Sequence, residues 1–217
     1  AHAYASPARP DLILATGDIV QDETTTAYQR FRALTADLGI PVCCLPGNHD
    51  VPGLMRATLD DAPFQYCGSI ERGDWTLVML DSVAPGDDGG MLAPSELERL
   101  ERILAERRTA HVLVALHHQP VPMGSRWLDG VALRNADEFL AVCDRHAALR
   151  AIVWGHVHQA SDRERNGVRL LSTPSTCAQF RPACDDFAID DRPPGYRWLD
   201  LGADGSIQTS VAWVEET

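Results

Sequence analysis

Short apolar runs alternate with amphipathic segments along this chain, a pattern typical of a sheet covered by helices. The first run, at residues 12–16, predicts a strand. A helix is predicted next because the following apolar side chains recur at helical spacing, at Ala27, Phe31, Leu34 and Leu38. The run at 42–45 predicts a second strand. Together these elements make a β-α-β unit, whose connection should be right-handed.

The alternation continues to the end of the chain. Further strands are predicted at residues 75–80, 112–116, 152–154, 168–171, 196–201 and 206–213. Two more helices are predicted, one beginning at Pro94 and one through residues 136–143. This order indicates an α/β (α+β) chain with two mixed sheets packed face to face and helices outside. Residues 1–5 look like the tail of a helix.

Length and composition fit a single domain over residues 1–217. At 45 % hydrophobic residues, a chain of 217 residues can bury a substantial core. The formal charge of −12 argues against a nucleic-acid partner, because such proteins usually carry a basic face. Any phosphate substrate would therefore be held by metal ions.

The sequence also indicates a location for the protein. Its longest apolar runs are strand-sized and do not approach the ~20 residues of a spanning helix, so no membrane partner is expected. The six cysteines are scattered without a C-x-x-C pair, which favours reduced thiols and a cytoplasmic location. Cys177 and Cys184 flank a predicted loop and would pair only in an exported protein.

Residues of ligand type follow four of the predicted strands at their carboxyl ends. The motifs are Gly17-Asp18, residues 47–50 (GNHD), His117-His118 and residues 155–158 (GHVH). In open α/β sheets ligands collect at this edge, so we expect the four motifs to meet in one site. Carboxylate, amide and imidazole groups together indicate a two-metal centre for phosphoester chemistry.

Asp18 and Asn48 are the expected oxygen ligands. One carboxylate can bridge two cations about 3.5–4 Å apart, and Asp18 is the candidate for this bridge. The carbonyl oxygen of Asn48 binds a divalent ion without adding negative charge beside the bridge. Alone, Gly-Asp would more often be a turn or a helix N-cap, but the ordered set of motifs favours the metal site.

His49 is the candidate general acid. Paired with a nearby acid such as Asp50, it would protonate a leaving alkoxide oxygen. A loop sequence of this kind is more often a simple turn, yet its position after a buried strand and downstream of Asp18 favours the site.

Two strand ends are expected to supply imidazole ligands. His117 is taken as a ligand, whereas His118 faces the other way under two-residue alternation and supports the site or packs; sequence alone leaves this choice open. His156 and His158 stand two apart on an extended segment, so they point to one side and can serve two adjacent metals.

The remaining polar and aromatic candidates are expected to have ordinary roles. Trp127 and residues 134–135 are more often a packing side chain and a helix start than contacts to a nucleotide base or ribose. Asp81 is expected to cap a turn. Three histidines outside the pattern are expected at the surface: His2, His111 and His146.

The four motifs resemble those of the calcineurin-like metallophosphoesterase superfamily, whose fold is a four-layer β-sandwich flanked by helices. More narrowly, four segments look like the bacterial class III 3',5'-cyclic AMP phosphodiesterases: residues 17–22, 127–129, 133–135 and 174–180. The resemblance covers nearly the whole chain.

This resemblance implies a role for each matched residue. It makes Asp18 the bridge between both metals and makes His158 a ligand of one of them. It places three ligands at the other metal, namely Asn48, His117 and His156. Asp18, Asn48, His49 and His158 would lie at the substrate phosphate.

The implied reaction is hydrolysis of cyclic AMP to 5'-AMP by in-line attack of a metal-bound hydroxide, with Asp18 and His49 catalytic. The resemblance also implies two divalent metal ions as cofactors. They would be Fe, Mn or Zn, because a ligand set of mixed nitrogen and oxygen atoms binds all three.

One departure from the superfamily concerns the start of the chain. The superfamily carries an Asp-x-His motif on its first strand, and nothing before Asp11 supplies it. We expect that an N-terminal segment with this strand precedes the 217 residues and that the native centre is binuclear; a half-sited protein is the alternative.

Two other functions stay open. The same site would serve other phosphodiesters or phosphomonoesters, because the motifs hold a phosphate and say little about its substituents. The alternative outside the enzymes is a non-catalytic binding module that keeps the fold. Neither the oligomeric state nor selectivity for cyclic AMP over cyclic GMP follows from the sequence.

Overall fold

The computed structural model describes residues 9–106 and 108–215. In chain order its elements are β1 (Ile13–Ala15), α1 (Thr25–Ala36), β2 (Val42–Cys44), α2 (Pro52–Thr58), β3 (Phe64–Tyr66), β4 (Gly68–Arg72), β5 (Trp75–Met79), α3 (Pro94–Glu106), β6 (His111–Leu116), α4 (Arg126–Asp129), α5 (Ala136–Cys143), β7 (Leu149–Trp154), β8 (Ser161–Arg165), β9 (Val168–Ser172), β10 (Gln179–Phe180), β11 (Ile189–Asp190), β12 (Gly195–Leu201) and β13 (Ile207–Trp213). The predicted helix tail at residues 1–5, and with it His2, lies outside the described residues.

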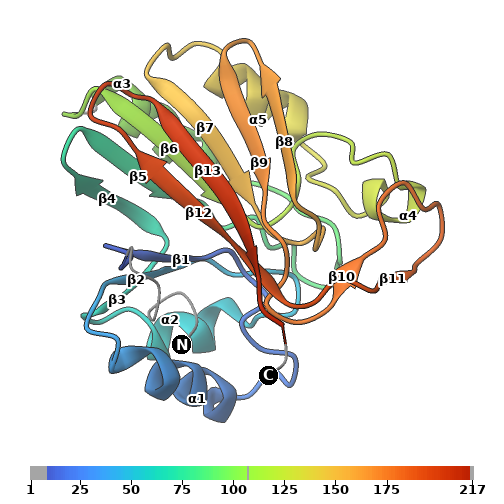
Figure 1. The fold of residues 1–217 in the computed structure, drawn as a ribbon. Coiled ribbons are helices and arrows are strands. Elements are labelled where there is room, and N and C mark those ends of the chain that lie inside the picture. The colour runs from blue at the N-terminus through green and yellow to red at the C-terminus, as the bar shows by residue number, and fades with distance from the viewer. Residues whose placement is uncertain (1–8, 107, 216–217) are drawn as a thin grey trace.

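A six-stranded sheet forms the centre of the molecule (Figure 1). Its strand order is β4-β5-β6-β7-β9-β8, with parallel pairing from β5 to β9 and antiparallel strands at both edges. Strand β6 is buried at every position, as its continuous apolar sequence predicts. Alternate residues face opposite sides, so Leu113 and Ala115 enter one hydrophobic cluster and Val112 and Val114 the other.

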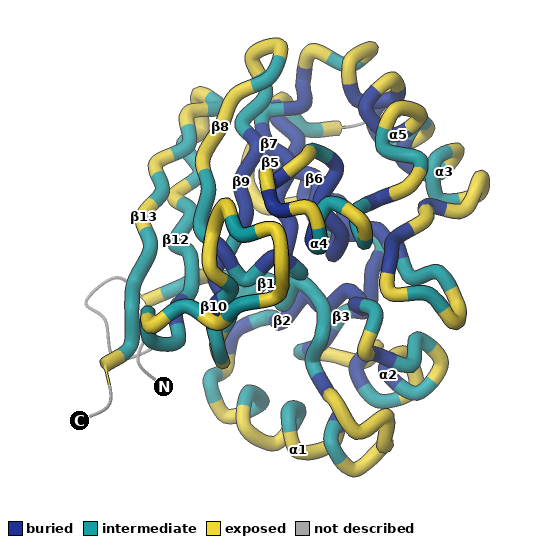
Figure 2. Tube along the Cα trace, turned by 90° about the vertical axis from the view of Figure 1, so that its right-hand side faces the viewer, coloured by how far each residue is buried: buried dark blue, intermediate teal, exposed yellow. Residues whose placement is uncertain are grey.

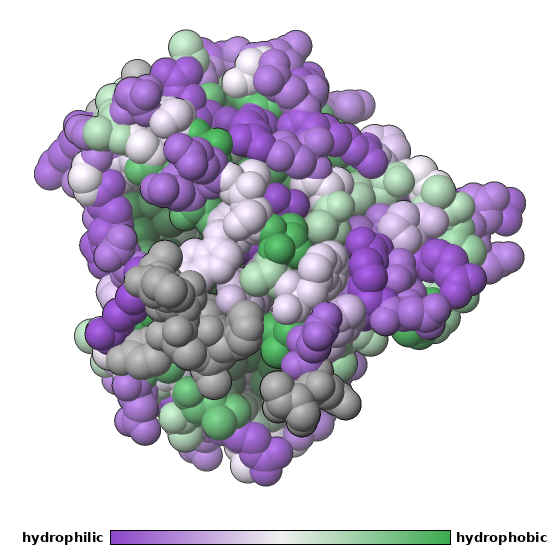
Figure 3. Space-filling model, viewed as in Figure 1, coloured by the Kyte–Doolittle hydropathy of each residue, from purple (hydrophilic) through white to green (hydrophobic). Residues whose placement is uncertain are grey.

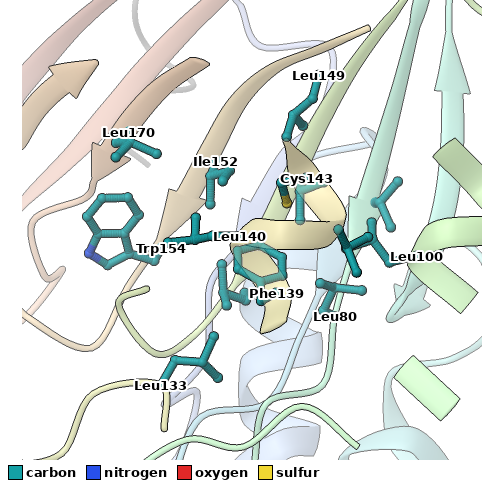
Figure 4. Packing of buried hydrophobic residues seen from close by; sticks show 14 of the residues in the cluster. Leu80, Leu100, Leu133, Phe139, Leu140, Cys143, Leu149, Ile152, Trp154 and Leu170 are labelled. Carbon is teal, nitrogen blue, oxygen red and sulfur yellow. The ribbon is translucent and has the colours of Figure 1, made fainter. Parts of the chain in front are cut away.

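Helices α3 and α5 cover one face of this sheet. Figure 4 shows Phe139 and Leu140 of α5 beside Ile152 and Trp154 of β7, with Leu100 of α3 close by. The opposite face packs against the smaller layer. Both predicted helices are therefore confirmed, and each presents its apolar side to the sheet.

The smaller layer contains two separate ladders. Strands β1, β2 and β3 form a parallel sheet, and β12 pairs with β13 as the predicted hairpin. Leu199, Leu201 and Ile207 of this hairpin pack on the same cluster as β2, while α1 and α2 lie outside the small sheet (Figure 1). The fold class is as expected, with one difference: the smaller layer combines a parallel ladder and a separate antiparallel ladder instead of one mixed sheet.

The predicted inner face of α1 is wrong at Leu34. This side chain is 73 % exposed, whereas Tyr28 is fully buried. The two residues are six apart, which places them about 120° apart around the helix axis. Tyr28 turns inward because its hydroxyl finds buried partners at Asp50 and the Val51 N–H. A hydropathy pattern does not reveal such a contact.

Two histidines expected at the surface instead stabilise the packing. His111 is 7 % exposed, and its ring lies tilted beside that of Trp75. Its Nε2 donates to the Ala203 carbonyl at 3.1 Å, which holds the turn of the β12–β13 hairpin in place. His146 is half-buried and lies 3.0 Å from Glu101 of α3. The prediction placed both histidines at the surface because contacts with partners distant along the chain are not visible in the sequence.

Hydrophilic residues cover much of the periphery of the face drawn in Figure 3, around paler and apolar residues nearer its middle. Among the helices of the described residues, none is long and apolar enough to cross a membrane.

Candidate metal centre

Four parallel strands deliver the candidate ligands to one place. Asp18 follows β1 and Asn48 follows β2, neighbours in the small sheet. His117 follows β6 and His156 follows β7, neighbours in the large sheet. The carboxyl ends of the two sheets thus meet, and the structure brings together these four side chains, which are up to 138 positions apart in the printed sequence (156 minus 18).

The ring of His117 lies at the centre of this group. Its Nδ1 is 2.7 Å from the Thr16 carbonyl oxygen, which only accepts, so Nδ1 carries the proton and Nε2 a lone pair. Three more ligand-type atoms surround Nε2: Asp18 Oδ2 at 3.3 Å, Asn48 Oδ1 at 3.2 Å and His156 Nδ1 at 3.1 Å.

Four ligand-type atoms this close need a shared proton or a cation among them. Metal bonds of 2.0–2.2 Å to nitrogen and oxygen place neighbouring ligand atoms roughly 3.0–3.5 Å apart, which matches the observed separations. The residues present therefore fit a divalent metal ion. The Nε2 of His156 is buried and has no hydrogen-bond partner among the described residues, so a further group is expected there.

Burial and mutual contact set the charges of the ligands. Burial alone would raise the pKa of Asp18, but His117 and the His49 N–H, 3.1 Å from Asp18 Oδ1, hold it well below its usual value. Burial would lower the pKa of His117, yet the charge of Asp18 raises it. Burial, with His117 nearby, lowers the pKa of His156 well below its usual value. His156 is therefore neutral at physiological pH and able to offer a lone pair.

His118 lies against this group but has both nitrogens engaged. Its ring centroid is 4.8 Å from that of His156. The Asp88 carbonyl accepts from Nε2 at 3.2 Å, so the proton is there, and Nδ1 accepts from the Ser82 hydroxyl at 2.8 Å. Burial lowers the pKa of this side chain to about 3. The geometry favours His117 over His118 as the ligand, because His118 has no free lone pair.

His158 stands beside the group and is oriented by two contacts. Its Nδ1 donates to the Ala178 carbonyl at 2.8 Å, which leaves Nε2 free to bind. Its ring stacks on Phe180, with centroids 4.1 Å apart. Burial lowers its pKa, and the charge of Asp18 acts in the opposite direction, so the two side chains share one electrostatic environment.

Two glycines let the loops approach closely. A Cβ atom on Gly17 would overlap His117 Nδ1, and one on Gly47 would overlap Asp18 Oδ1. Gly17 also has φ of +95°, a conformation that other residues rarely adopt. These positions require glycine for the carboxylate and the imidazole to meet.

The expected pair of Asp50 with His49 is not formed. Asp50 is 5 % exposed and accepts four hydrogen bonds, whose donors are the Ile19, Val20 and Gly47 N–H groups and the Tyr28 hydroxyl. None of the hydrogen bonds in the described part of the chain joins Asp50 to the His49 side chain. Asp50 instead ties the loop after β1 to the loop after β2, while His49 is exposed at the site.

Several residues that shape the site were missed from the sequence. Thr16 acts through its backbone carbonyl, and Ser82 holds His118 from a loop 36 positions away. Asp81 does cap a turn, accepting from the Val83 N–H at 3.0 Å, and it also accepts from the Tyr66 hydroxyl. Only the position of Ser82, three residues past the end of the buried strand β5, offered a signal.

The chain belongs to the calcineurin-like phosphoesterase family, whose sequence profile matches residues 2–160. The family resemblance, the fold class and the assignment as a hydrolase are therefore confirmed. The family and the histidine cluster fit divalent metal ions.

Individual relatives have names that are more specific than the family description. The chain is 42 % identical over 209 residues to the 3',5'-cyclic adenosine monophosphate phosphodiesterase CpdA of Pseudomonas aeruginosa, covering 96 % of this chain and 76 % of that protein. It is 43 % identical over 208 residues to CpdA of Escherichia coli strain K12, covering 95 % and 76 %. A dimetal phosphatase from Danio rerio shares the fold, with a TM-score of 0.64 at 14 % identity over 87 % of this chain and 79 % of that chain.

Proposed function

We propose that this protein is a metal-dependent phosphodiesterase that hydrolyses 3',5'-cyclic AMP to 5'-AMP. The observation that carries the proposal is the convergence of ligand atoms on His117 Nε2 within a chain 42–43 % identical to cyclic AMP phosphodiesterases over nearly its full length. The convergence supports the metals, and the relatives support the substrate.

Five residues would hold the two divalent ions of this proposal: Asp18, Asn48, His117, His156 and His158. The two oxygens of Asp18 face different directions, since Oδ2 points at the His117 cluster and Oδ1 accepts the His49 N–H. This orientation suits a bridging carboxylate. When bound, such ions supply Lewis-acid stabilisation of charge on the phosphate and make water nucleophilic at neutral pH.

His49 is the proposed proton donor to the departing ribose 3'-oxygen. Its backbone N–H is fixed on Asp18, so the exposed ring stands at the rim of the ligand group. Because Asp50 accepts its hydrogen bonds from the loops and Tyr28, it is not the group that orients the imidazole in this proposal. A protonated imidazole in this position neutralises the leaving oxygen as the ester bond to phosphorus breaks.

The substrate of this proposal is small and anionic. The formal charge of −12 disfavours long polyanions, and the metals rather than a basic surface would hold the phosphate. Iron, manganese and zinc all accept this ligand set, so the metal is a matter for measurement.

Replacing Asn48 tests the proposal. The protein, expressed from its complete reading frame, is stripped with a chelator and reloaded with Mn²⁺, and 5'-AMP is measured by chromatography. We expect Asn48→Ala to lose at least one hundred-fold in kcat/KM, on the order of 3 kcal/mol, and to retain less metal. Asn166→Gly is the matched control, since Asn166 lies in the β8–β9 turn with φ of +53°, where glycine is at ease.

The outcomes separate the competing functions. Equal turnover by Asn48→Ala and wild type would refute the proposed site. Turnover of p-nitrophenyl esters without turnover of cyclic AMP would favour another phosphoester as substrate. Metal binding without turnover of any ester would favour a binding module.

A further inference from the structure

Three aromatic side chains from separate segments lie against one another beside the candidate metal centre. Trp127 of α4 is 5.0 Å from Phe180 of β10 and 5.3 Å from Phe187, measured between ring centroids. Phe180 and Phe187 are 5.4 Å apart. All three pairs are edge-to-face, an arrangement that aromatic rings prefer. We name Trp127, Phe180 and Phe187 the aromatic shelf.

The aromatic shelf is continuous with a proposed ligand. Phe180 stacks on His158 with ring planes 5° apart, and His158 Nδ1 donates to the carbonyl of Ala178, two positions before Phe180. These contacts fix the shelf relative to the histidine. A small ligand whose phosphate lies at His158 therefore has its remaining atoms within reach of these rings.

Phe187 is the member of the shelf that faces water. It is 60 % exposed, although two rings touch it, and Ile189 in β11 is 47 % exposed. Figure 2 shows the exposed segment between β10 and β11 next to α4. Hydrogen bonds anchor this segment, because the Cys184 N–H donates to Ser125 Oγ at 3.2 Å and the Arg126 N–H donates to Asp185 at 3.4 Å. The exposed ring is thus held in position at the edge of the site.

We propose that the aromatic shelf binds the nucleobase of the substrate and that Phe187 stacks on the base. This inference rests on the proposed function, since it says where the rest of that substrate binds. An exposed aromatic ring gains contact area at little cost in conformational entropy when a flat base covers it. The ring of a 3',5'-cyclic nucleotide holds phosphate and base at a fixed separation, so a rigid surface suits it.

The charges around the shelf favour a neutral base over a second phosphate. Asp185 and Asp186 precede Phe187, and Arg126 lies 3.9 Å from the Asp185 carboxylate. Acidic groups here repel polyphosphates and extended nucleic acids but do not repel an uncharged purine. Stacking accepts any base, so the shelf itself does not discriminate adenine from guanine.

The test compares two ligands that differ only in the base. Binding of 5'-AMP and of ribose 5-phosphate to the Mn²⁺-loaded protein is measured by titration calorimetry, which needs no turnover. We expect wild type to bind 5'-AMP more tightly. We expect Phe187→Ala to raise Kd for 5'-AMP between about 5-fold and 100-fold, with Kd for ribose 5-phosphate unchanged. Phe187→Tyr, which keeps the aromatic face, should restore the affinity for 5'-AMP.

Ile189→Ala is the matched control, because Ile189 of β11 is an exposed apolar residue two positions after Phe187 and outside the shelf. Equal affinities of wild type for the two ligands would overturn the inference, as would a Phe187→Ala protein with unchanged Kd for 5'-AMP. A parallel rise in both Kd values would also overturn it and assign Phe187 to anchoring the segment. If 5'-AMP binds through Phe187 but cyclic AMP is not hydrolysed, the shelf stands and the proposed function fails.

Discussion

The substitution Asp50→Asn distinguishes two roles for a buried carboxylate. The sequence pattern suggested that Asp50 assists His49 in proton transfer. The structure instead shows its oxygens bound to the loops that carry Asp18 and Asn48. Asparagine has nearly the same shape but replaces one acceptor with a donor, so it breaks the loop connection without creating a cavity.

The cost follows from the four hydrogen bonds of Asp50. If the amide nitrogen takes the Oδ2 position, it faces the N–H groups of Ile19 and Gly47. In the other orientation it faces the Val20 N–H and the Tyr28 hydroxyl, and the hydroxyl can turn to accept. This second orientation costs less, but it still leaves the buried Val20 N–H without an acceptor, which costs about 1–3 kcal/mol. The remaining hydrogen bonds also lose their charged acceptor.

One effect opposes this loss. Burial raises the pKa of Asp50 despite its hydrogen bonds, which means that the buried charge is itself unfavourable. The amide of Asp50→Asn carries no charge and avoids this part of the cost. We expect the free energy of unfolding to fall by about 2 kcal/mol, which a domain of ordinary stability survives. Metal affinity should fall too, because Asp18 and Asn48 are no longer held together.

Urea unfolding of the metal-free protein, metal content and the pH dependence of kcat together form the assay. Tyr28→Phe is the matched control, since it removes one donor from Asp50 and the acceptor of the Val51 N–H without approaching His49. It should cost about 1–2 kcal/mol and lower metal content in the same direction. An Asp50→Asn protein with wild-type stability and metal content but a shifted alkaline limb of the pH–rate profile would refute this reasoning and restore Asp50 as the partner of His49.

Three further predictions follow from the same geometry. Gly17→Ala should lose metal and at least about 1–2 kcal/mol of stability, because φ at this position is +95° and the added Cβ would overlap His117. Gly73→Ala is the control: its φ is +53°, an added Cβ would meet no atom within contact distance, and the variant should keep its metal. Equal metal content of the two variants, measured by plasma spectrometry, would contradict this prediction. Asp81→Asn should stabilise the metal-free protein at pH 8 more than at pH 4. Burial raises the pKa of Asp81, so wild type loses stability as pH rises through the folded value and the amide does not; urea titrations showing equal gains would count against it. Removing metal with a chelator should lower Tm by about 5–10 °C, since metal at 100 times its Kd contributes about 2.7 kcal/mol, and a Tm that does not move would argue that no metal is bound in the folded state.

Burial explains which elements the sequence predicted. Strand β6 has a continuous apolar run because both of its faces are covered, and the hydropathy pattern reveals such a strand directly. Strand β8 reads SDRER and lies at an edge, so its sequence carries no such signal. Strand β3 has three residues, and its pairing with β2 rather than its composition makes it a strand.

The site likewise has residues that the sequence pattern predicted and residues whose roles depend on tertiary contacts. The positions of Asp18, His117 and His156 after apolar strands predicted that these side chains meet, because parallel strands end at one edge. The roles of Asp50 and Tyr28 depend on which backbone groups they reach, and chain spacing does not encode those contacts. Phe187 is similar: its relation to His158 exists only after the segment between β10 and β11 folds against α4.

The central claim is metal-dependent hydrolysis of cyclic AMP at the His117 centre. The most direct measurement follows 5'-AMP formation by the protein, expressed from its complete reading frame, before chelation, after chelation and after reloading with Mn²⁺. We predict 5'-AMP as the sole product, loss of activity on chelation and recovery on reloading. Hydrolysis that is unaffected by chelation, or a metal-loaded protein that leaves cyclic AMP intact, would contradict the claim.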